Sequence, residues 1–267
     1  MNETVGQPLS INDITAMKRK GEKITCLTAY DASFSAVIDK VGIDIMLVGD
    51  SLGMVVQGQH TTVPVTIEQM VYHSQCVSRA RKRAYLIADL PFMTYSSPAD
   101  AVKNAARLMQ DGGAHMVKLE GAKLDCVRFL VEQGIPVCGH LGLLPQSIHQ
   151  LGAYRVQGKE LHAGQKIRAD ALQLQEAGAS LLVLECIPAA LAKQISEELI
   201  IPVIGIGAGV DCDGQVLVVY DMLNIGISKL PRFSKNFITD CKGVEEAIKA
   251  YYHAVKNAEF PGLEHSF

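Results

Sequence analysis

Eight short apolar segments recur along this chain of 267 residues, and they constrain its fold more than any other feature. They cover residues 24–29, 45–49, 85–88, 116–119, 136–139, 181–184, 202–206 and 216–220. Most are continuously apolar rather than alternating, which is typical of strands buried on both faces, as in a parallel sheet. Helical stretches lie between them, so the order of elements is a series of βα units.

Helix-start signals support this order of elements. Ser97-Pro98 places an N-cap and then a proline at the first helical position, and Thr66 opens a capping box. Ser10 opens an additional helix before the first strand, and a last helix covers residues 244–258. We expect the helix after Ser10 to close the bottom of a barrel and the last helix to pack on the barrel or on a neighbouring subunit.

Eight βα units in a chain of this length predict a (β/α)₈ TIM barrel, in one domain that covers residues 1–267. Residues 1–23 would form an N-terminal helical extension, and residues 233–267 a C-terminal helical segment. A doubly wound sheet is the main alternative. However, the residues after the first strand, TAYDASFS, lack the glycine fingerprint that is typical of that fold.

The composition excludes several classes of function. A net charge of −3 provides no basic field to attract nucleic acid. No segment reaches the roughly eighteen uninterrupted apolar residues of a membrane span, and the first residues, MNETVGQPLS, lack the layout of a signal peptide. The seven cysteines form no C-x-x-C pair and are expected to be reduced thiols. We therefore expect a cytoplasmic protein that binds neither nucleic acid nor membranes.

Polar side chains follow five of the predicted strands, at the point where each strand ends. These residues are Asp50 and Ser51 after the second strand, Asp89 after the third, Glu120 after the fourth, His140 after the fifth and Glu185 after the sixth. In a TIM barrel the C-terminal ends of the strands meet at one mouth, where active sites form. Each residue alone has a structural interpretation, such as a helix cap or a hydrogen-bonded histidine. Their equivalent positions on five strands indicate one functional cluster.

The residue types in this cluster indicate a metal and an acid substrate. Asp50, Asp89 and Glu120 supply oxygen ligands without the His or Cys spacing of a zinc site, and therefore predict Mg²⁺. The cation would bind a 2-oxo acid and stabilise its enolate as a Lewis acid. Lys118, two residues before Glu120 and so on the same strand face, would neutralise the anionic oxygens of the substrate. Glu185 would be the general acid/base.

Several segments together also resemble a known family. They are GDSLGMVVQG, ADLPFMTY, MVKLEG, PVCGHLGLLPQS, LLVLECIP, IPVIGIGAG and the C-terminal PGLEHSF. In this order, from about residue 24 to the end, they resemble the ketopantoate hydroxymethyltransferase family. The resemblance implies transfer of a hydroxymethyl group from 5,10-methylenetetrahydrofolate to 3-methyl-2-oxobutanoate, which gives 2-dehydropantoate for pantothenate and coenzyme A biosynthesis.

The same resemblance implies a barrel of the phosphoenolpyruvate/pyruvate type, dependence on Mg²⁺, and a cytoplasmic homo-oligomer, typically a decamer. It also implies a role for each matched residue. The implied metal residues are Asp50, Asp89 and Glu120, and the implied substrate residues are Asp50, Ser51, Asp89, Lys118 and His140. Glu185 is the implied proton acceptor.

Three alternative functions stay open at this point. Another Mg²⁺-dependent enolate barrel, a lyase or an aldolase acting on a pyruvate-like 2-oxo acid, would use the same carboxylates but no folate. A Schiff-base aldolase would use Lys118 as its nucleophile, and borohydride trapping would detect it. A barrel that only binds a small acid would have no need for Glu185, which is present.

Overall fold

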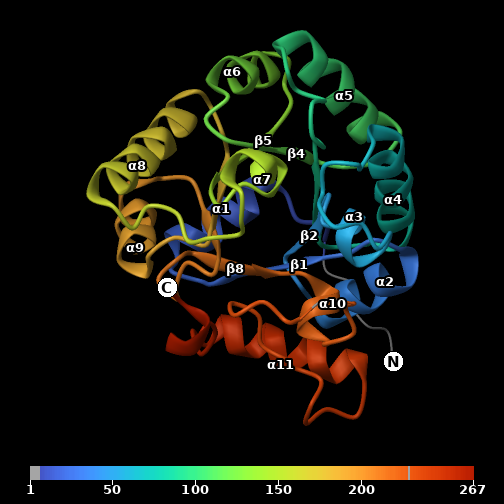
Figure 1. Ribbon diagram of the computed structural model, residues 1–267. Coiled ribbons are helices and arrows are strands. Elements are labelled where there is room, and N and C mark those ends of the chain that lie inside the picture. Colours follow the sequence, from blue (N-terminus) through green and yellow to red (C-terminus); the bar gives the residue numbers. More distant parts are fainter. Residues whose placement is uncertain (1–6, 228) are drawn as a thin grey trace.

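The computed structural model describes residues 7–227 and 229–267, in which eight parallel strands form a closed barrel (Figure 1). The strands are β1 (Ile24–Thr28), β2 (Ile45–Val48), β3 (Tyr85–Asp89), β4 (Met116–Glu120), β5 (Val137–Gly142), β6 (Leu181–Glu185), β7 (Val203–Ile206) and β8 (Gly214–Leu217). Each strand pairs with the next one in the chain, and β8 pairs with β1 to close the sheet. The predicted TIM barrel is confirmed, and the doubly wound alternative is wrong.

Helices surround the barrel on its outside (Figure 1). The longer ones are α1 (Ile11–Arg19), α2 (Ala32–Val41), α4 (Ile67–Ala80), α5 (Pro98–Gln110), α6 (Leu124–Glu132), α8 (Leu161–Glu176), α9 (Ala189–Glu198) and α11 (Val244–Lys256). Short turns of helix are α3 (Leu52–Val55), η1 (Pro145–Ser147), α7 (Ile148–Leu151), α10 (Val219–Met222) and η2 (Leu263–His265). The caps expected at Ser10, Thr66 and Ser97 are confirmed, because each side chain accepts a hydrogen bond from the third residue after it.

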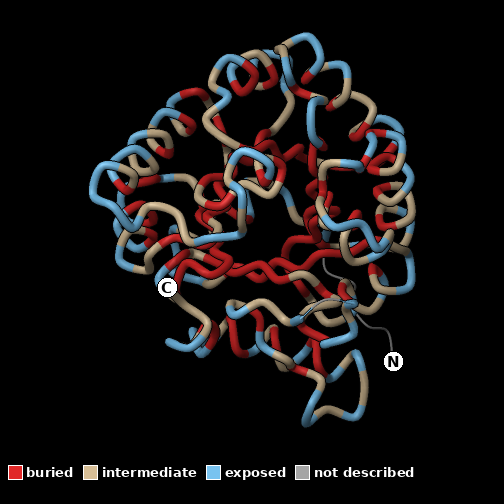
Figure 2. Tube along the Cα trace, in the orientation of Figure 1, coloured by how far each residue is buried: buried red, intermediate tan, exposed pale blue. Residues whose placement is uncertain are grey.

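Buried side chains form two clusters, one between the barrel and its helices and one inside the barrel. Figure 2 shows that the barrel strands are mostly buried and that the outer turns of the helices are mostly exposed. Strand β4 shows how the sequence divides between the two clusters. Val117 and Leu119 belong to the outer cluster, whereas Met116 belongs to the interior cluster. Since side chains alternate along a strand, Lys118 and Glu120 face the interior together with Met116. The strand is continuously buried, as the sequence indicated, but its two faces contact different clusters.

Two helices outside the regular βα units stabilise the barrel from different sides. Ile14 of α1 is fully buried in the interior cluster, so α1 covers one end of the barrel, as expected. Helix α11 packs against β1 and α2, where the Tyr251 hydroxyl donates to the backbone oxygens of Cys26 and Gln215 at 2.8 and 2.9 Å. Residues 1–6 of the predicted N-terminal extension lie outside the described residues.

The prediction of the eighth strand was wrong at both ends. The segment predicted to be a strand at residues 216–220 becomes helical at Val219, whose backbone N–H donates to Thr28 Oγ1 at 2.9 Å instead of extending the sheet. The strand begins earlier, at Gly214, where a Cβ would lie 2.3 Å from the backbone oxygen of Ile24. Only glycine allows β1 and β8 to approach this closely.

Among the described residues, no helix combines the length and the apolar character that crossing a membrane requires.

Candidate active site

Strand pairing brings the predicted polar residues to one end of the barrel interior. Asp89 on β3 is paired in register with Lys118 on β4, and Glu120 on β4 is paired with His140 on β5. Residues paired across neighbouring strands face the same side of a sheet, so these four side chains all point into the barrel. Glu185 ends β6 on the same interior face as Val183.

The turn after β2 places Asp50 and Ser51 beside these residues. The backbone N–H of Asp50 donates to Asp89 Oδ2 at 3.1 Å. Gly49 makes this approach possible, because a Cβ there would lie 2.7 Å from Ser51 Oγ and 3.5 Å from Asp89 Oδ2. Ser51 Oγ also forms a hydrogen bond of 2.8 Å with the hydroxyl of Tyr30. The structure therefore brings together every residue that the sequence predicted for the site.

Lys118 supplies the positive charge at the centre of the cluster. Its Nζ lies 2.8 Å from Asp89 Oδ1, and the two side chains are only 5% and 4% exposed. Burial alone would lower the pKa of this ammonium, but the carboxylates Asp89, Glu120 and Asp50 raise it above its ordinary value. Lys118 therefore stays protonated near neutral pH, which argues against a role as a Schiff-base nucleophile.

The buried carboxylates outnumber this single cation. Burial, and next the charge of Asp89, raise the pKa of Asp50 to about 7. Burial, and next the charge of Asp50, raise the pKa of Glu120 well above its ordinary value. Buried carboxylates are stable as anions only when they are paired or coordinate a metal. The cluster therefore lacks positive charge, and a divalent cation would supply it.

The arrangement of oxygens suits a cation held by two protein ligands. Asp50 Oδ2 accepts a hydrogen bond of 2.8 Å from Gln146 Nε2, whereas its Oδ1 forms no hydrogen bond with the described part of the chain. No group of three or more His, Cys, Asp or Glu side chains among the described residues is arranged to hold a metal ion. Mg²⁺ commonly binds through one or two carboxylates and keeps several waters, so Asp50 and Asp89 fit it without a preformed cage.

His140 lies between two of the acids. Its Nε2 is 3.2 Å from Glu185 Oε2, and its Nδ1 is 3.7 Å from Glu120 Oε1. Burial, and next the charge of Lys118, lower the pKa of the imidazole. A neutral imidazole has one N–H to donate, so it can hold the Glu185 carboxylate in a fixed orientation without neutralising it.

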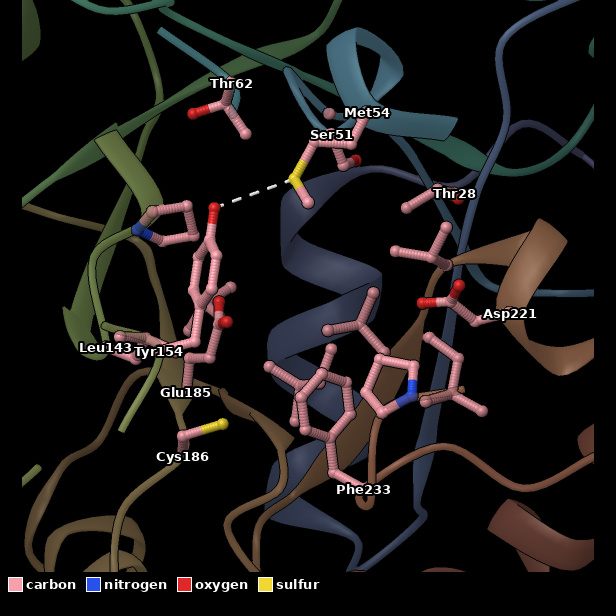
Figure 3. Close-up of a pocket in the computed structure, with 18 of the residues that line it drawn as sticks. Thr28, Ser51, Met54, Thr62, Leu143, Tyr154, Glu185, Cys186, Asp221 and Phe233 are labelled. Atoms are coloured by element: carbon pink, nitrogen blue, oxygen red, sulfur yellow. Dashed lines mark hydrogen bonds between the residues drawn. The ribbon is translucent and has the colours of Figure 1, made fainter. Parts of the chain in front are cut away.

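A cavity of about 740 Å³ opens above these residues. Its lining includes the whole predicted cluster together with side chains from the loops at the mouth. Figure 3 shows Tyr154 and Glu185 on one side of the cavity and Asp221 on the opposite side. The Tyr154 hydroxyl donates a hydrogen bond of 3.7 Å to Met54 Sδ, which joins the loop after α7 to α3. The cavity is in the range of ligand sites and has room beside a small acid for a second, larger molecule.

The chain is similar to known proteins over most of its length. The family model for ketopantoate hydroxymethyltransferase matches residues 8–263. The chain belongs to the ketopantoate hydroxymethyltransferase family. It is 58% identical over 262 residues to 3-methyl-2-oxobutanoate hydroxymethyltransferase of Methylococcus capsulatus, with 97% of each chain covered. It is 55% identical over 261 residues to the protein of the same name in Nitrosococcus oceani, with 97% of this chain and 99% of that one covered.

Membership of the ketopantoate hydroxymethyltransferase family makes the chain an enzyme of hydroxymethyl transfer. Its fold is similar to the solved phosphoenolpyruvate phosphomutase from Streptomyces platensis subsp. rosaceus, with a TM-score of 0.61, 10% identity, and 81% and 83% of the two chains covered. This likeness shows that the two proteins share a barrel fold.

In this ketopantoate hydroxymethyltransferase family member, sequence reasoning missed Gln146 and Tyr95. The Gln146 amide donates to Asp50, and the Gln146 backbone N–H donates to Glu120 Oε2 at 3.0 Å. The Tyr95 hydroxyl donates to Gln146 Oε1 and accepts from the backbone N–H of Glu120 at 3.3 Å. The available signal was the segment GLLPQS, which carries Gln146 directly beyond the strand that ends near His140.

Proposed function

We propose that this enzyme transfers a hydroxymethyl group from 5,10-methylenetetrahydrofolate to 3-methyl-2-oxobutanoate and forms 2-dehydropantoate, with Mg²⁺ at Asp50 and Asp89. Water supplies the hydroxyl oxygen, and tetrahydrofolate is the second product. One observation carries the proposal: Asp50, Asp89 and Lys118 form a buried, anion-rich cluster at the mouth of a barrel that belongs to this family. The names of the relatives supply the acid, and the sequence resemblance supplies the folate.

The cation and Lys118 have complementary roles in binding the acid. When bound, Mg²⁺ supplies Lewis-acid stabilisation of the negative charge that develops on the keto oxygen. Asp50 and Asp89 hold it, and Glu120 supports Asp50 through their shared partner Gln146. The Lys118 ammonium, fixed 2.8 Å from Asp89 Oδ1, binds the anionic oxygens of the acid.

Glu185 is the base that we assign to proton removal at C3 of the acid. Its side chain is 14% exposed, compared with 4% for Asp89 and 3% for Glu120, so its oxygens have the best access to the cavity. His140 orients the carboxylate from the interior side. The electron pair left at C3 then forms the new carbon–carbon bond to the one-carbon unit of the folate.

We also infer that the enzyme acts in the cytoplasm as a homo-oligomer, a decamer in the form that the resemblance implies. Large apolar side chains that are exposed in the single chain support association, among them Tyr72, Leu161 and Ile200 at 62, 79 and 76% exposure. Sedimentation equilibrium of the purified protein tests the oligomer, and a monomer at micromolar concentration would contradict it.

The activity is tested with purified protein, 3-methyl-2-oxobutanoate and 5,10-methylenetetrahydrofolate, with and without EDTA. We expect 2-dehydropantoate to form only when both the folate and a divalent cation are present. Consumption of a 2-oxo acid without folate would instead support the alternative lyase or aldolase. Turnover that is unchanged after complete metal removal would refute the metal assignment.

The base is tested by exchange of the C3 hydrogen of the acid in deuterated water. Glu185→Gln should abolish this exchange and still bind the acid in a Mg²⁺-dependent way. Glu132→Gln, a change of the same kind at an exposed position on α6, is the matched control and should exchange normally. Exchange that survives in Glu185→Gln would exclude Glu185 as the base.

A further inference from the structure

We propose that Asp221 recognises the pteridine ring of the folate co-substrate by accepting two hydrogen bonds from the amino–lactam edge of the ring. This inference rests on the proposed function, because it assigns the part of the same cavity that folate uses. The two N–H donors on that edge lie parallel, as those of a guanidinium do, and therefore match the two oxygens of a carboxylate.

The position of Asp221 separates it from the acid-binding cluster. Asp221 belongs to α10, which follows β8, and it lines the cavity. In Figure 3 its carboxylate is directed into the cavity, across from Tyr154 and Glu185. The residues that we assign to the acid and its cation come from the turn after β2 and from β3 and β4, so Asp221 is available for another ligand in the same space.

Asp221 has no donor of its own in the described part of the chain. Its carboxylate forms no hydrogen bond or ion pair there, and burial raises its pKa to about 6. A carboxylate is an acceptor, and leaving one partly buried without a donor is costly. A ligand that presents N–H groups would remove this cost. The other carboxylates of the cavity each already have a nitrogen partner; they are Asp50, Asp89, Glu120 and Glu185.

Asp221 is also close to the reacting end of the cavity. Burial raises the pKa of Tyr30 and the charge of Asp221 adds to this effect, whereas hydrogen bonds with Ser51 and Thr28 lower it. The Tyr30 hydroxyl in turn forms the 2.8 Å hydrogen bond with Ser51, which is adjacent to Asp50. Asp221, Ser51 and Asp50 line the same cavity, so a ring held at Asp221 would share this space with the acid, as transfer of a single carbon requires.

The rest of the lining matches the two ends of a folate. Apolar side chains also line the cavity, among them Met54, Val156, Ile227 and Phe233, and they suit a flat ring. Three cations also line the cavity, namely Arg155, Lys229 and Arg232, and all three are exposed. Arg155 is adjacent in sequence to Tyr154, which lies across the cavity from Asp221 (Figure 3). A molecule with a donor edge at Asp221 and carboxylates near Arg155 fits these two positions, and the glutamate of folate supplies those carboxylates.

The first experiment compares Asp221→Asn with the wild-type protein in calorimetric titrations with tetrahydrofolate and with 6-methyltetrahydropterin, which lacks the glutamate. We expect the dissociation constants of both ligands to rise about tenfold to a hundredfold. The uncharged amide of asparagine has only one acceptor oxygen, and its NH₂ group faces an N–H donor of the ring. Asp211→Asn, on an exposed loop that does not line the cavity, is the control and should bind both ligands normally. Unchanged binding in Asp221→Asn would overturn the inference.

The second experiment tests the direction of the ligand with Arg155→Gln. This variant should lose affinity for tetrahydrofolate and keep its affinity for 6-methyltetrahydropterin. An equal loss of affinity for both ligands would place the pteridine ring at Arg155 and would also overturn the assignment. Deuterium exchange at C3 without folate, measured in each variant, reports that the protein is folded and that its acid end is intact.

The two proposals fail in different ways. If the wild-type protein binds no tetrahydrofolate and makes no 2-dehydropantoate, the proposed function fails, and this inference fails with it. If the wild-type protein uses folate but Asp221→Asn binds it equally well, only the assignment of Asp221 fails.

Discussion

Replacement of Asp50 by asparagine should stabilise the metal-free protein and abolish its activity. Asp50 is 4% exposed, and its amide counterpart can still accept the hydrogen bond from Gln146. What the variant loses is a carboxylate whose ionisation in the folded state is opposed by burial and by Asp89. The free energy of unfolding should therefore rise in the variant, in contrast to most substitutions of buried residues.

The pH dependence of this gain follows from the direction of the shift. The pKa of Asp50 is raised in the folded state, from 3.8 to about 7. Below the pKa of the unfolded state, Asp50 is protonated in both the folded and the unfolded protein, so it does not lower the free energy of unfolding. As the pH rises towards the pKa of the folded state, Asp50 ionises in the unfolded protein first. This ionisation favours the unfolded state over the folded one. At about 1.4 kcal/mol per pKa unit, the full cost above pH 7 is at most roughly 4 kcal/mol, so we expect a gain of about 2–4 kcal/mol near pH 8.

Urea unfolding in EDTA, followed by circular dichroism near pH 5 and near pH 8, measures this gain. The exposed Asp125→Asn variant removes the same charge from a side chain that is 86% exposed, and it should show no comparable change. A gain that does not grow between the two pH values, or a loss of stability near pH 8, would refute the reasoning. Added Mg²⁺ should stabilise the wild-type protein and have little effect on Asp50→Asn, because only the native site binds the cation.

Three further predictions concern Lys118 and Gln146 in this site and Asp44 outside it. Because Lys118 stays protonated, treatment with borohydride and the 2-oxo acid should leave the protein without a covalent adduct, as measured by mass spectrometry. Gln146→Ala should weaken Mg²⁺ binding about tenfold to a hundredfold in calorimetric titrations, since it removes the partner that orients a ligand carboxylate. Asp44→Ala should lower the free energy of unfolding by about 3–5 kcal/mol in urea titrations, because Arg83 and Lys256, at 3.1 and 2.6 Å from its carboxylate, lose their shared partner.

The barrel could be predicted because its strands are buried on both faces. An interior layer and a helix-facing layer make each strand continuously apolar, and that pattern is visible without knowledge of tertiary contacts. The eighth strand was misjudged because Val218, Val219 and Tyr220 have strand-type side chains but lie where the chain turns into α10. At the other end of this strand, Gly214 is required by contact with β1, and such a contact between distant segments leaves no local signal.

The cluster of polar residues at the strand ends could equally be predicted from the sequence. Closure of the barrel requires all strand ends to meet, so residues as distant in sequence as Asp50 and Glu185 had to line one mouth. Closure of the barrel does not constrain the paths of the loops. Gln146 reaches Asp50 only because the segment after β5 returns over the mouth, and Tyr95 meets Gln146 from the loop after β3. Neither contact follows from spacing or composition.

The two ends of the cavity therefore differ in how the chain encodes them. The residues that we propose to bind and activate the acid lie on or directly after strands, whose register holds them in place. Asp221 lies on a short helical turn, and the cations Arg155, Lys229 and Arg232 lie on loops. The register of the barrel does not position these segments. If this division is functional, changes in the loops alter the affinity for folate without affecting proton removal from the acid. Changes at the strand ends affect proton removal even when no folate is present.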